Sequence, residues 1–374
     1  MEPYNEYLIP DPFGLQNTGV LCYFNSFLQA LCACSSFTNA VLKNKEYLSK
    51  TNTGIAVTKF VENYSSRLRP ADADNNTAPN ITAPNISAPN ISAPNITAPA
   101  GQDRQQDRQQ DRQQDRQHSI NILRALCTDL RERRPNTPFG TGQESAHEVF
   151  ILLLDMMEDP SKSSKNGIIS SIESPITKLF LHKGMWNSFC KNCNKIVSKD
   201  VDYGVIFDMH HVDYNLNYIN PNINKTPLDF SNMIRQHSSI VSDYKCEQCN
   251  IKGDSVRFYD LRRIPEIIFC SFNVYQEFGG KRYKRYIPPY IELPSSEAGK
   301  KHIFKQVSQI EHSGSLYGGH YWAYSLRRNN QIYLLNDGQV SPVTEFQSTR
   351  DTYIVVYHLS QCGCRNAATA RVTY

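Results

Sequence analysis

The sequence predicts an α+β fold, in which helices in the first half of the chain precede antiparallel strands in the second half. Up to about position 157, apolar residues recur at the three- and four-residue spacing of helices. From about position 178 onward they alternate with polar or small residues, as in strands. The length of 374 residues fits about two domains, or one large domain with insertions.

Composition excludes several classes of protein. Lys and Arg number 40 against 36 Asp and Glu, and the net charge of +4 is too small to indicate a nucleic-acid partner. No apolar run reaches the ~18 residues of a membrane span. The first residues lack a basic stretch followed by an apolar one, so we expect an intracellular protein, cytoplasmic and/or nuclear, that is not secreted. Its 11 cysteines should then be catalytic, metal-bound or buried rather than paired in disulfides.

Residues 70–118 are repetitive. The first half repeats Ala-Pro-Asn-Ile-Ser/Thr, and a proline at every fifth position blocks both helix and central strand. The second half repeats Asp-Arg-Gln-Gln, which has no apolar face and could form only a transient helix. The few isoleucines cannot offset the entropy lost on ordering. We therefore expect 70–118 to be a disordered insert.

Two helices are predicted on either side of the insert. The first follows Cys22 and presents one apolar face, made of Phe24, Leu28, Leu31 and Cys32. The second spans about 143–157 and carries a continuous apolar stripe. Thr141 or Gly142 can start this second helix, and Pro160 ends it.

Strands are predicted in the second half of the chain. Residues 201–207 alternate, and 267–269 form a strongly apolar run within 257–274. Further strands are expected at 283–293, 320–326, 332–335 and 353–359.

Two Cys-x-x-Cys pairs lie among polar turn residues between strands. They consist of Cys190 with Cys193 and Cys246 with Cys249. Each pair can present two thiolates to one ion, and two pairs complete a tetrahedral Zn²⁺ site. A redox role needs only one pair, normally at the start of a helix. We therefore expect a structural zinc site that braces a β lobe and takes no part in chemistry.

Cys22 follows the turn 17–19 and starts the first predicted helix. A helix N-terminus favours the thiolate, so the pKa of this thiol should be lowered. A cysteine at a helix start is nevertheless more often a packing residue. Cys22 alone does not indicate catalysis.

His320 supplies a second reactive group. It lies on a strand that begins with Gly318 and Gly319, and residues 327–330 form a turn after it. If the hairpin is centred near position 328, position 320 faces position 336. The hairpin would then place His320 beside Asn336 or Asp337, as the second and third members of a nucleophile triad.

Several segments together resemble the ubiquitin-specific proteases. Residues 14–29 are similar to the cysteine box of that family, and 317–324 with 335–340 to its histidine box. Residues 143–148 resemble an intermediate helix motif, and the two Cys-x-x-Cys pairs fall where the family has zinc-bearing fingers. Residues 263–272 and 353–357 resemble the strand before the ubiquitin-contacting loops and the closing strand. The resemblance covers about 14–359.

This resemblance implies a papain-like cysteine peptidase with a helical thumb, a β palm and zinc-ribbon fingers. The catalytic domain would span 14–359, with the thumb at 14–69 and 119–177 and the fingers and palm at 178–359. Residues 1–13 would be an N-terminal segment and 360–374 a C-terminal tail. The expected activity is hydrolysis of isopeptide or peptide bonds after the C-terminal Gly-Gly of ubiquitin.

The resemblance also implies residue roles. Cys22 would be the nucleophile and His320 the general base and acid. Asn336 would orient His320, Asp337 would assist, and Asn17 would stabilise the oxyanion. The substrate-binding residues would be Glu148, Gly318, Gly319 and Tyr321, and the Zn²⁺ ligands Cys190, Cys193, Cys246 and Cys249.

Three departures from the family pattern stand out. Val20 and Leu21 replace a small or polar residue and a threonine before the nucleophile, and Ser145 replaces an acid, which should reduce affinity for the basic tail of ubiquitin. The basic residue usual near Ser271 is also absent. None of these removes a reacting group, so we expect an active enzyme.

Competing interpretations remain open at this level. One is a catalytically weak ubiquitin-binding scaffold, and another is a peptidase for a different ubiquitin-like modifier. A zinc-ribbon nucleic-acid binder fits less well, because the basic and aromatic residues 280–286 lie beside the presumed substrate loops. The expected partners are ubiquitin and ubiquitinated proteins, with no nucleic acid and no membrane, and the chain is expected to be a monomer.

Overall fold

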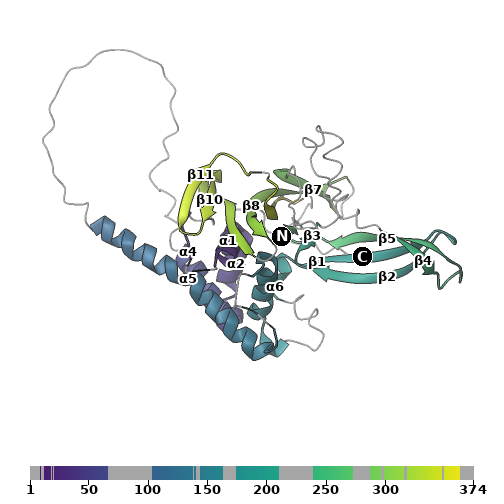
Figure 1. Ribbon diagram of the computed structural model, residues 1–374, viewed down its shortest axis with the longest axis horizontal. Helices are drawn as coiled ribbons and strands as arrows, with labels where there is room; N and C mark the ends of the chain where they lie inside the picture. Colours follow the sequence, from purple (N-terminus) through teal and green to yellow (C-terminus); the bar gives the residue numbers. More distant parts are fainter. Residues whose placement is uncertain are drawn as a thin grey trace, which may run out of the picture.

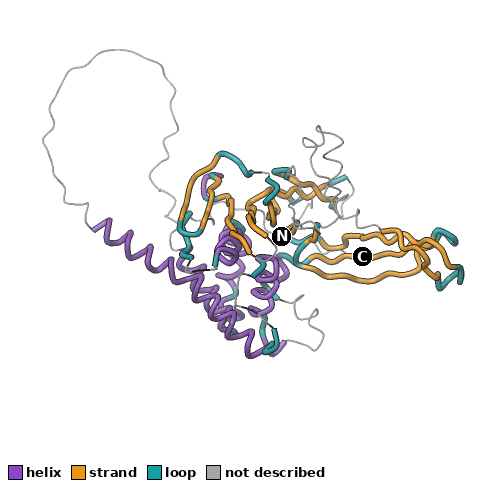
Figure 2. Tube along the Cα trace, viewed as in Figure 1, coloured by secondary structure: helices purple, strands orange, loops and turns teal. Residues whose placement is uncertain are grey.

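The computed structural model describes residues 9, 12–17, 19, 21–65, 103–137, 139, 144–162, 174–209, 239–272, 287–295, 299–315, 318–347 and 349–362. Helices gather in one lobe, an eight-stranded sheet lies against them, and a four-stranded sheet projects from the other side (Figures 1 and 2). The predicted α+β class is confirmed. No helix in the described part of the chain is both long and apolar enough to cross a membrane.

The helical lobe is arranged around α1. Its helices are α1 (Cys22–Cys32), α2 (Ser35–Lys43), α3 (Lys45–Leu48), α4 (Asn52–Ser65), α5 (Asp103–Arg133) and α6 (Ala146–Met157). Short 3₁₀ turns occur at Pro160–Lys162, Thr177–Leu179 and Arg328–Asn330. All residues of α1 are buried, because α1 contacts α2, α5 and α6 as well as β8, β9 and β10. The predicted one-sided apolar stripe therefore understates how deeply this helix lies.

The eight-stranded sheet carries the second half of the site. Its main path runs in the order β11-β10-β9-β8-β12-β6-β3, and β7 also pairs with β8. All its pairings are antiparallel except that of β3 with β6. The strands are β3 (Phe207–Asp208), β6 (Ile267–Ser271), β7 (Tyr290–Pro294), β8 (Lys301–Ser315), β9 (Gly318–Leu326), β10 (Ile332–Asn336), β11 (Gln339–Val343) and β12 (Thr352–Gln361).

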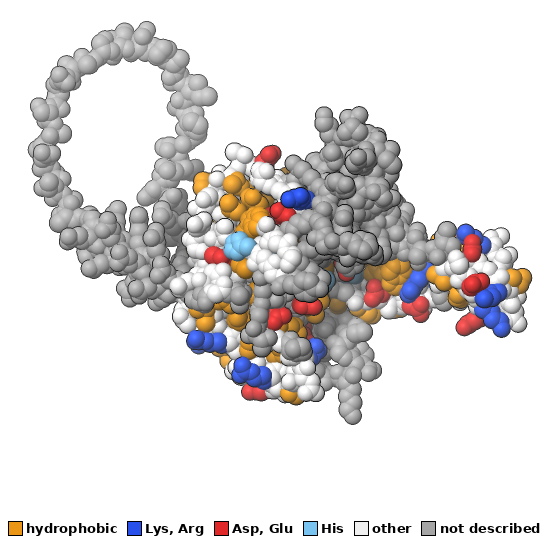
Figure 3. Space-filling model, in the orientation of Figure 1, with side chains coloured by type: hydrophobic (Ala, Val, Ile, Leu, Met, Phe, Trp, Pro, Cys, Tyr) orange, Lys and Arg blue, Asp and Glu red, His pale blue; other side chains and the backbone are white. Residues whose placement is uncertain are grey.

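The four-stranded sheet is antiparallel, in the order β2-β1-β5-β4. It consists of β1 (His182–Cys190), β2 (Lys195–Gly204), β4 (Ser239–Lys245) and β5 (Lys252–Arg263). Charged side chains gather at its far end (Figure 3), where Lys191 pairs with Asp254 and Lys252 with Asp243. These exposed pairs contribute little stability, typically about 0–1 kcal/mol each.

Aromatic packing joins the helical lobe to the eight-stranded sheet. The ring of Phe150 on α6 stacks on Phe269 of β6 at 4.4 Å, and both contact Phe180. Phe27 of α1 packs against the same pair. Removing one such buried ring costs roughly 3–5 kcal/mol. This cluster fixes α1 against the sheet and so sets the position of Cys22.

Helix α5 corrects the prediction for the insert. Residues 70–102 lie outside the described residues, but from Asp103 the chain is helical and continuous with the packed part of α5, whose first half projects past the other helices (Figure 1). Ile122, Leu126 and Leu130 anchor the second half in the core. Arg and Gln are good helix formers, and extending an anchored helix is far easier than nucleating one. His118 is also in contact, since its ring nitrogen lies 2.6 Å from the Asn63 amide.

Other element boundaries also differ from the prediction. Helix α6 starts at Ala146, because the Ser145 hydroxyl accepts the N–H of His147 and caps the helix. Strand β7 begins at Tyr290 rather than at 283, and 283–286 lie outside the described residues. Strand β8, the longest in the described chain, was not predicted. Phe13, which we expected before the domain boundary, is buried with its ring 4.8 Å from that of Tyr64.

Candidate active site

Cys22 is the first residue of α1 and is 3% exposed. Burial raises the pKa of its thiol, the backbone N–H of Tyr321 opposes this increase, and the Asp337 carboxylate adds to it. The sequence predicted a lowered pKa from the helix N-terminus, and this prediction is wrong for the free protein because desolvation outweighs the helix. The contributions of Tyr321 and Asp337 place the thiol beside β9 and the turn after β10.

His320 and Asn336 form the contact that the sequence predicted. The ring Nε2 of His320 lies 2.7 Å from Oδ1 of Asn336. An amide oxygen only accepts, so Nε2 carries the proton and Nδ1 is left as the basic nitrogen. The predicted register is off by one residue, since Ala323 pairs with Leu335 and the hairpin is centred at position 329. The side chains still meet because backbone pairing of β9 with β10 ends before they do.

Asn17 and Asp337 form a second pair at the same place. The Asn17 Nδ2 donates to Asp337 Oδ2 at 3.0 Å, while its Oδ1 accepts the N–H groups of Gly19 and Leu21, each at 3.0 Å. Asn25 donates to the other oxygen of Asp337 at 2.8 Å. Asp337 was expected to assist His320, but its two oxygens are held by the amides of Asn17 and Asn25. Asp337 therefore positions Asn17 and α1.

Asn25 is a site residue that the sequence reasoning missed. It lies three residues after Cys22, on the same side of α1, and is 2% exposed. A buried asparagine next to the nucleophile was a usable signal, because a buried amide needs partners. Its Nδ2 also lies 3.2 Å from the Gln16 carbonyl.

The expected substrate-binding residues divide by location. Gly319 is exposed on β9, and a Cβ there would lie 2.2 Å from the Ser313 carbonyl oxygen and 2.5 Å from His312 Nε2, so packing on β8 also requires a glycine. Gly318, before it, is half-buried. The Tyr321 side chain is 6% exposed and stacks on His312 at 4.1 Å, so only its backbone faces the site. Glu148 is exposed in the first turn of α6, where it helps to raise the pKa of Tyr353.

The four cysteines of the Cys-x-x-Cys pairs converge at one end of the four-stranded sheet. Their Sγ atoms all lie within 4.8 Å of one another. Cys190 to Cys249 and Cys193 to Cys246 are each 3.9 Å, far beyond a disulfide bond. Tetrahedral Zn²⁺ with bonds of about 2.3 Å places sulfur atoms about 3.8 Å apart. The four thiols therefore fit a tetrahedral ion, and together they fill its coordination shell.

Local backbone geometry shapes both cysteine turns. Asn194 and Asn250, which directly follow the two pairs, have φ angles of 54° and 59°. Asn tolerates this left-handed conformation better than other non-glycine residues. In the second turn the N–H of Asn250 donates to the Cys246 carbonyl at 2.8 Å. Each turn is thus formed by its own residues.

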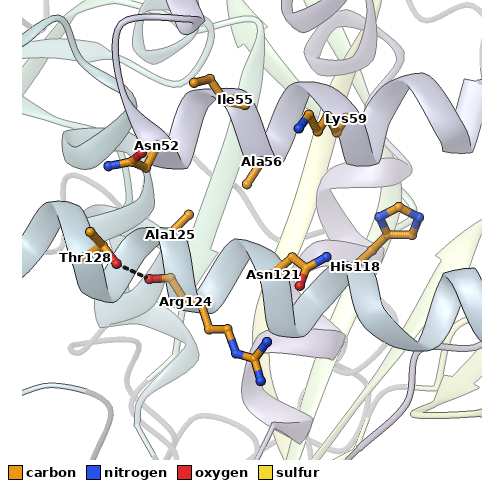
Figure 4. A pocket seen from close by; sticks show the side chains of 9 residues that line it. All are labelled: Asn52, Ile55, Ala56, Lys59, His118, Asn121, Arg124, Ala125 and Thr128. Carbon is orange, nitrogen blue, oxygen red and sulfur yellow. Dashed lines mark hydrogen bonds between the residues drawn. The ribbon is translucent and has the colours of Figure 1, made fainter.

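A groove of about 410 Å³ lies between α4 and α5, away from these sites (Figure 4). Lys59 and Arg124 lie on its two walls. Thr128, at one end of it, donates its hydroxyl hydrogen bond to the Arg124 carbonyl at 2.9 Å. None of the expected catalytic or metal-binding residues lines this groove.

Comparison with known proteins identifies the class that this fold and site define. Residues 13–357 match the model of the ubiquitin carboxyl-terminal hydrolase family, and the chain belongs to that family. Human ubiquitin carboxyl-terminal hydrolase 21 is 28% identical over 125 residues, which are 31% of this chain and 22% of that protein. Ubiquitin carboxyl-terminal hydrolase 36 of Drosophila ananassae is 29% identical over 138 residues, 34% of this chain and 13% of that protein. The matched region thus spans less than a quarter of these relatives.

Solved structures share the fold. The SAGA deubiquitinating module of Ubp8, Sgf11, Sus1 and Sgf73 bound to monoubiquitin matches with a TM-score of 0.63 at 15% identity, covering 96% of this chain and 72% of that chain. The same module bound to ubiquitin aldehyde matches equally well, at 14% identity. The thumb, palm and fingers expected from the sequence correspond to the helical lobe, the eight-stranded sheet and the four-stranded sheet.

Proposed function

We propose that this chain is a deubiquitinating cysteine protease that hydrolyses the peptide or isopeptide bond after the C-terminal Gly-Gly of ubiquitin. The observation that carries this proposal is the 2.7 Å contact of His320 with Asn336, on the strand whose Tyr321 N–H faces the Cys22 thiol. Membership of the ubiquitin carboxyl-terminal hydrolase family supports it. Solved proteins of the same fold are bound to ubiquitin or ubiquitin aldehyde, which supports ubiquitin as the partner.

The first half-reaction forms a thioester. His320 Nδ1 takes the proton of the Cys22 thiol, and the sulfur attacks the carbonyl carbon of the last glycine of ubiquitin. The carbonyl oxygen becomes an oxyanion, and the remaining N–H of the Asn17 amide stabilises it, a contribution of roughly 3–4 kcal/mol in comparable sites. The C–N bond then breaks, and His320 returns the proton to the departing amine.

The second half-reaction regenerates the thiol. His320 takes a proton from a water molecule, whose oxygen attacks the thioester carbonyl. The C–S bond breaks, ubiquitin leaves with a free carboxylate, and the proton on His320 returns to the Cys22 sulfur. Asn336 keeps the ring of His320 in one orientation throughout, as an amide that fixes the ring without a full negative charge.

The test of this function is release of a fluorophore from the C-terminal amide of ubiquitin. We expect turnover by the wild-type chain and none by Cys22→Ala. Ubiquitin carrying a C-terminal electrophile should attach to Cys22, as mapped by mass spectrometry. Attachment to another cysteine would overturn the site assignment.

The same assay separates the alternatives. Binding of ubiquitin without turnover would favour a weak ubiquitin-binding scaffold. Turnover of another ubiquitin-like modifier in place of ubiquitin would favour a peptidase for that modifier. Ser145 in place of an acid favours weaker binding of the basic tail, so a high KM for ubiquitin substrates is expected.

We also propose that Cys190, Cys193, Cys246 and Cys249 hold one structural Zn²⁺. Bound zinc would tie the two turns together and leave no position open for substrate. Elemental analysis of the purified chain should give about one zinc per molecule. Cys193→Ser should lower this content, whereas Cys362→Ser, which alters a cysteine outside the cluster, should not.

A further inference from the structure

Residues 13–17, here called the strap, lie between α1 and the turn 336–339. The strap is tied down through its backbone. The N–H of Leu15 donates to the Asp337 carbonyl at 2.9 Å, and Gln29 Nε2 donates to the Phe13 carbonyl at 2.7 Å. Asn17 ends the strap and bonds to the Asp337 side chain at 3.0 Å. The position of Asn17 therefore depends on how closely the strap approaches the turn.

Gly14 sets the distance of this approach. A Cβ built on Gly14 would lie 2.5 Å from the carbonyl oxygen, 2.7 Å from the carbonyl carbon and 2.8 Å from the Cα of Gly338. These neighbours are backbone atoms, so they cannot rotate aside as a flexible side chain could. A methyl group at position 14 would have to push the strap about 1 Å away from the turn to reach ordinary van der Waals contact, about 3.5 Å or more.

The reverse substitution meets no such obstacle. A Cβ built on Gly338 has nothing within 4 Å. Neither Gly14 nor Gly338 has a φ in the left-handed range, so backbone strain does not distinguish them. The two glycines face each other, yet only one of them needs to lack a side chain.

We propose that Gly14 is a positioning residue for the reaction proposed above, because its bare backbone sets Asn17 at its distance from Asp337 and Cys22. This inference rests on the proposed function. Misplacing a catalytic group by about 1 Å can reduce the rate about 100-fold. The role of Gly14 lies in the geometry of the oxyanion donor and leaves the affinity for ubiquitin unchanged.

The experiment compares Gly14→Ala with Gly338→Ala in the full chain. In hydrolysis of the ubiquitin C-terminal fluorophore amide, we expect Gly14→Ala to lower kcat about 100-fold with KM within about twofold. Gly338→Ala should stay within about twofold of wild type in both constants. Rates are expressed per active site titrated with the ubiquitin electrophile, so a partly unfolded preparation does not mimic a slow enzyme.

Hydrogen exchange of the Leu15 amide provides a readout that needs no activity. We expect exchange at Leu15 to be at least 10-fold faster in Gly14→Ala than in Gly338→Ala, since only the former separates Leu15 from Asp337. Equal behaviour of the two variants in exchange, or equal kcat values, would overturn the proposal. A wild-type chain with no turnover would refute the proposed function, while the exchange measurement would still decide whether Gly14 sets the strap.

Discussion

The active site and the cysteine cluster are both built from segments far apart in the chain, but they are held together differently. Each half of the cluster is a short turn shaped by its own residues, including Asn194 or Asn250 in the left-handed conformation. The active site has no self-sufficient half. Cys22 lies on α1, Asn17 on the strap, and His320 and Asn336 on a hairpin, and buried packing of α1 brings them together.

This difference predicts two modes of failure. The cluster needs an ion to join its halves, because four thiolates at 3.9 Å would otherwise repel one another. The active site needs only the core, since its contacts are hydrogen bonds between groups that packing has already placed. The predictions below separate these two dependences, from the largest expected effect to the smallest.

Loss of zinc should have the largest effect, and it should be local. Structural zinc contributes on the order of 10 kcal/mol to folding in small metal-bound modules. We expect Cys249→Ser, or treatment with a strong chelator, to release the four-stranded sheet, detected as fast hydrogen exchange in β4 and β5. Exchange in α1 and α6 should change little, and Cys362→Ser serves as the control. Equal loosening of both regions would show that the cluster and the core are one unit.

Removing the oxyanion donor should do the opposite, leaving the fold and losing the chemistry. Asn17→Ala is expected to lower kcat by about 10²–10³-fold, about 3–4 kcal/mol, with KM nearly unchanged. Steady-state hydrolysis of the ubiquitin fluorophore amide measures this. Asn44→Ala is the matched control, because Asn44 bonds only locally to the Ala40 carbonyl at 2.7 Å at the end of α2. A kcat for Asn17→Ala within threefold of wild type would exclude Asn17 as the donor.

Acid should weaken the joint between the helical lobe and the sheet. His358 of β12 is fully buried against Ser36 of α2, and burial lowers its pKa from 6.5 to about 4. Below pH 6.5 the unfolded chain protonates this histidine, while the folded chain resists down to about pH 4. Folding therefore loses up to about 3 kcal/mol as pH falls through this window.

The measurement is the melting temperature of wild type and His358→Gln between pH 7 and 4. The variant should lose less stability across this range. Buried His182 in β1 has a pKa lowered to about 3 by burial and contributes with the same sign, but it is common to both proteins and cancels in the difference. Parallel curves for the two proteins would remove His358 as the acid-sensitive group.

The smallest predicted effect concerns the charge of Asp337, and its two readouts should move in opposite directions. The carboxylate raises the pKa of Cys22. Asp337→Asn should therefore increase the thiolate fraction and speed alkylation of Cys22 by iodoacetamide a few-fold at pH 8. Turnover should fall, because Asn17 and Asn25 lose the acceptor that holds them.

The control for this charge effect lies in the other region. Asp254→Asn removes an exposed carboxylate of the four-stranded sheet, whose partner is Lys191. It should change neither alkylation nor turnover. Slower alkylation in Asp337→Asn would mean that the carboxylate acts on Cys22 by something other than its charge.

Sequence patterns found the elements whose signal is local. The strands at β6, β9, β10 and β12 and the helices α1 and α6 follow from periodicity. Strand β8 gave no such signal, because polar residues on it are buried. Ser308 pairs with the Ser325 hydroxyl at 2.7 Å, and Glu311 accepts from Thr352 at 2.8 Å. These partners exist only once β9 and β12 lie on either side.

The sequence by itself determined which residues carry the proposed chemistry: Cys22 and His320 by their motifs, Asn336 by its place after the hairpin, and four thiols in two pairs. It also determined the two cysteine turns, because near neighbours in the chain shape them. Only the tertiary structure decided that Asp337 holds Asn17 and Asn25, that burial raises the pKa of Cys22, and that Gly14 must be bare while Gly338 need not be. The physical reason is that hydrogen-bond partners, desolvation and close backbone contacts depend on atoms hundreds of residues away, which packing alone brings near.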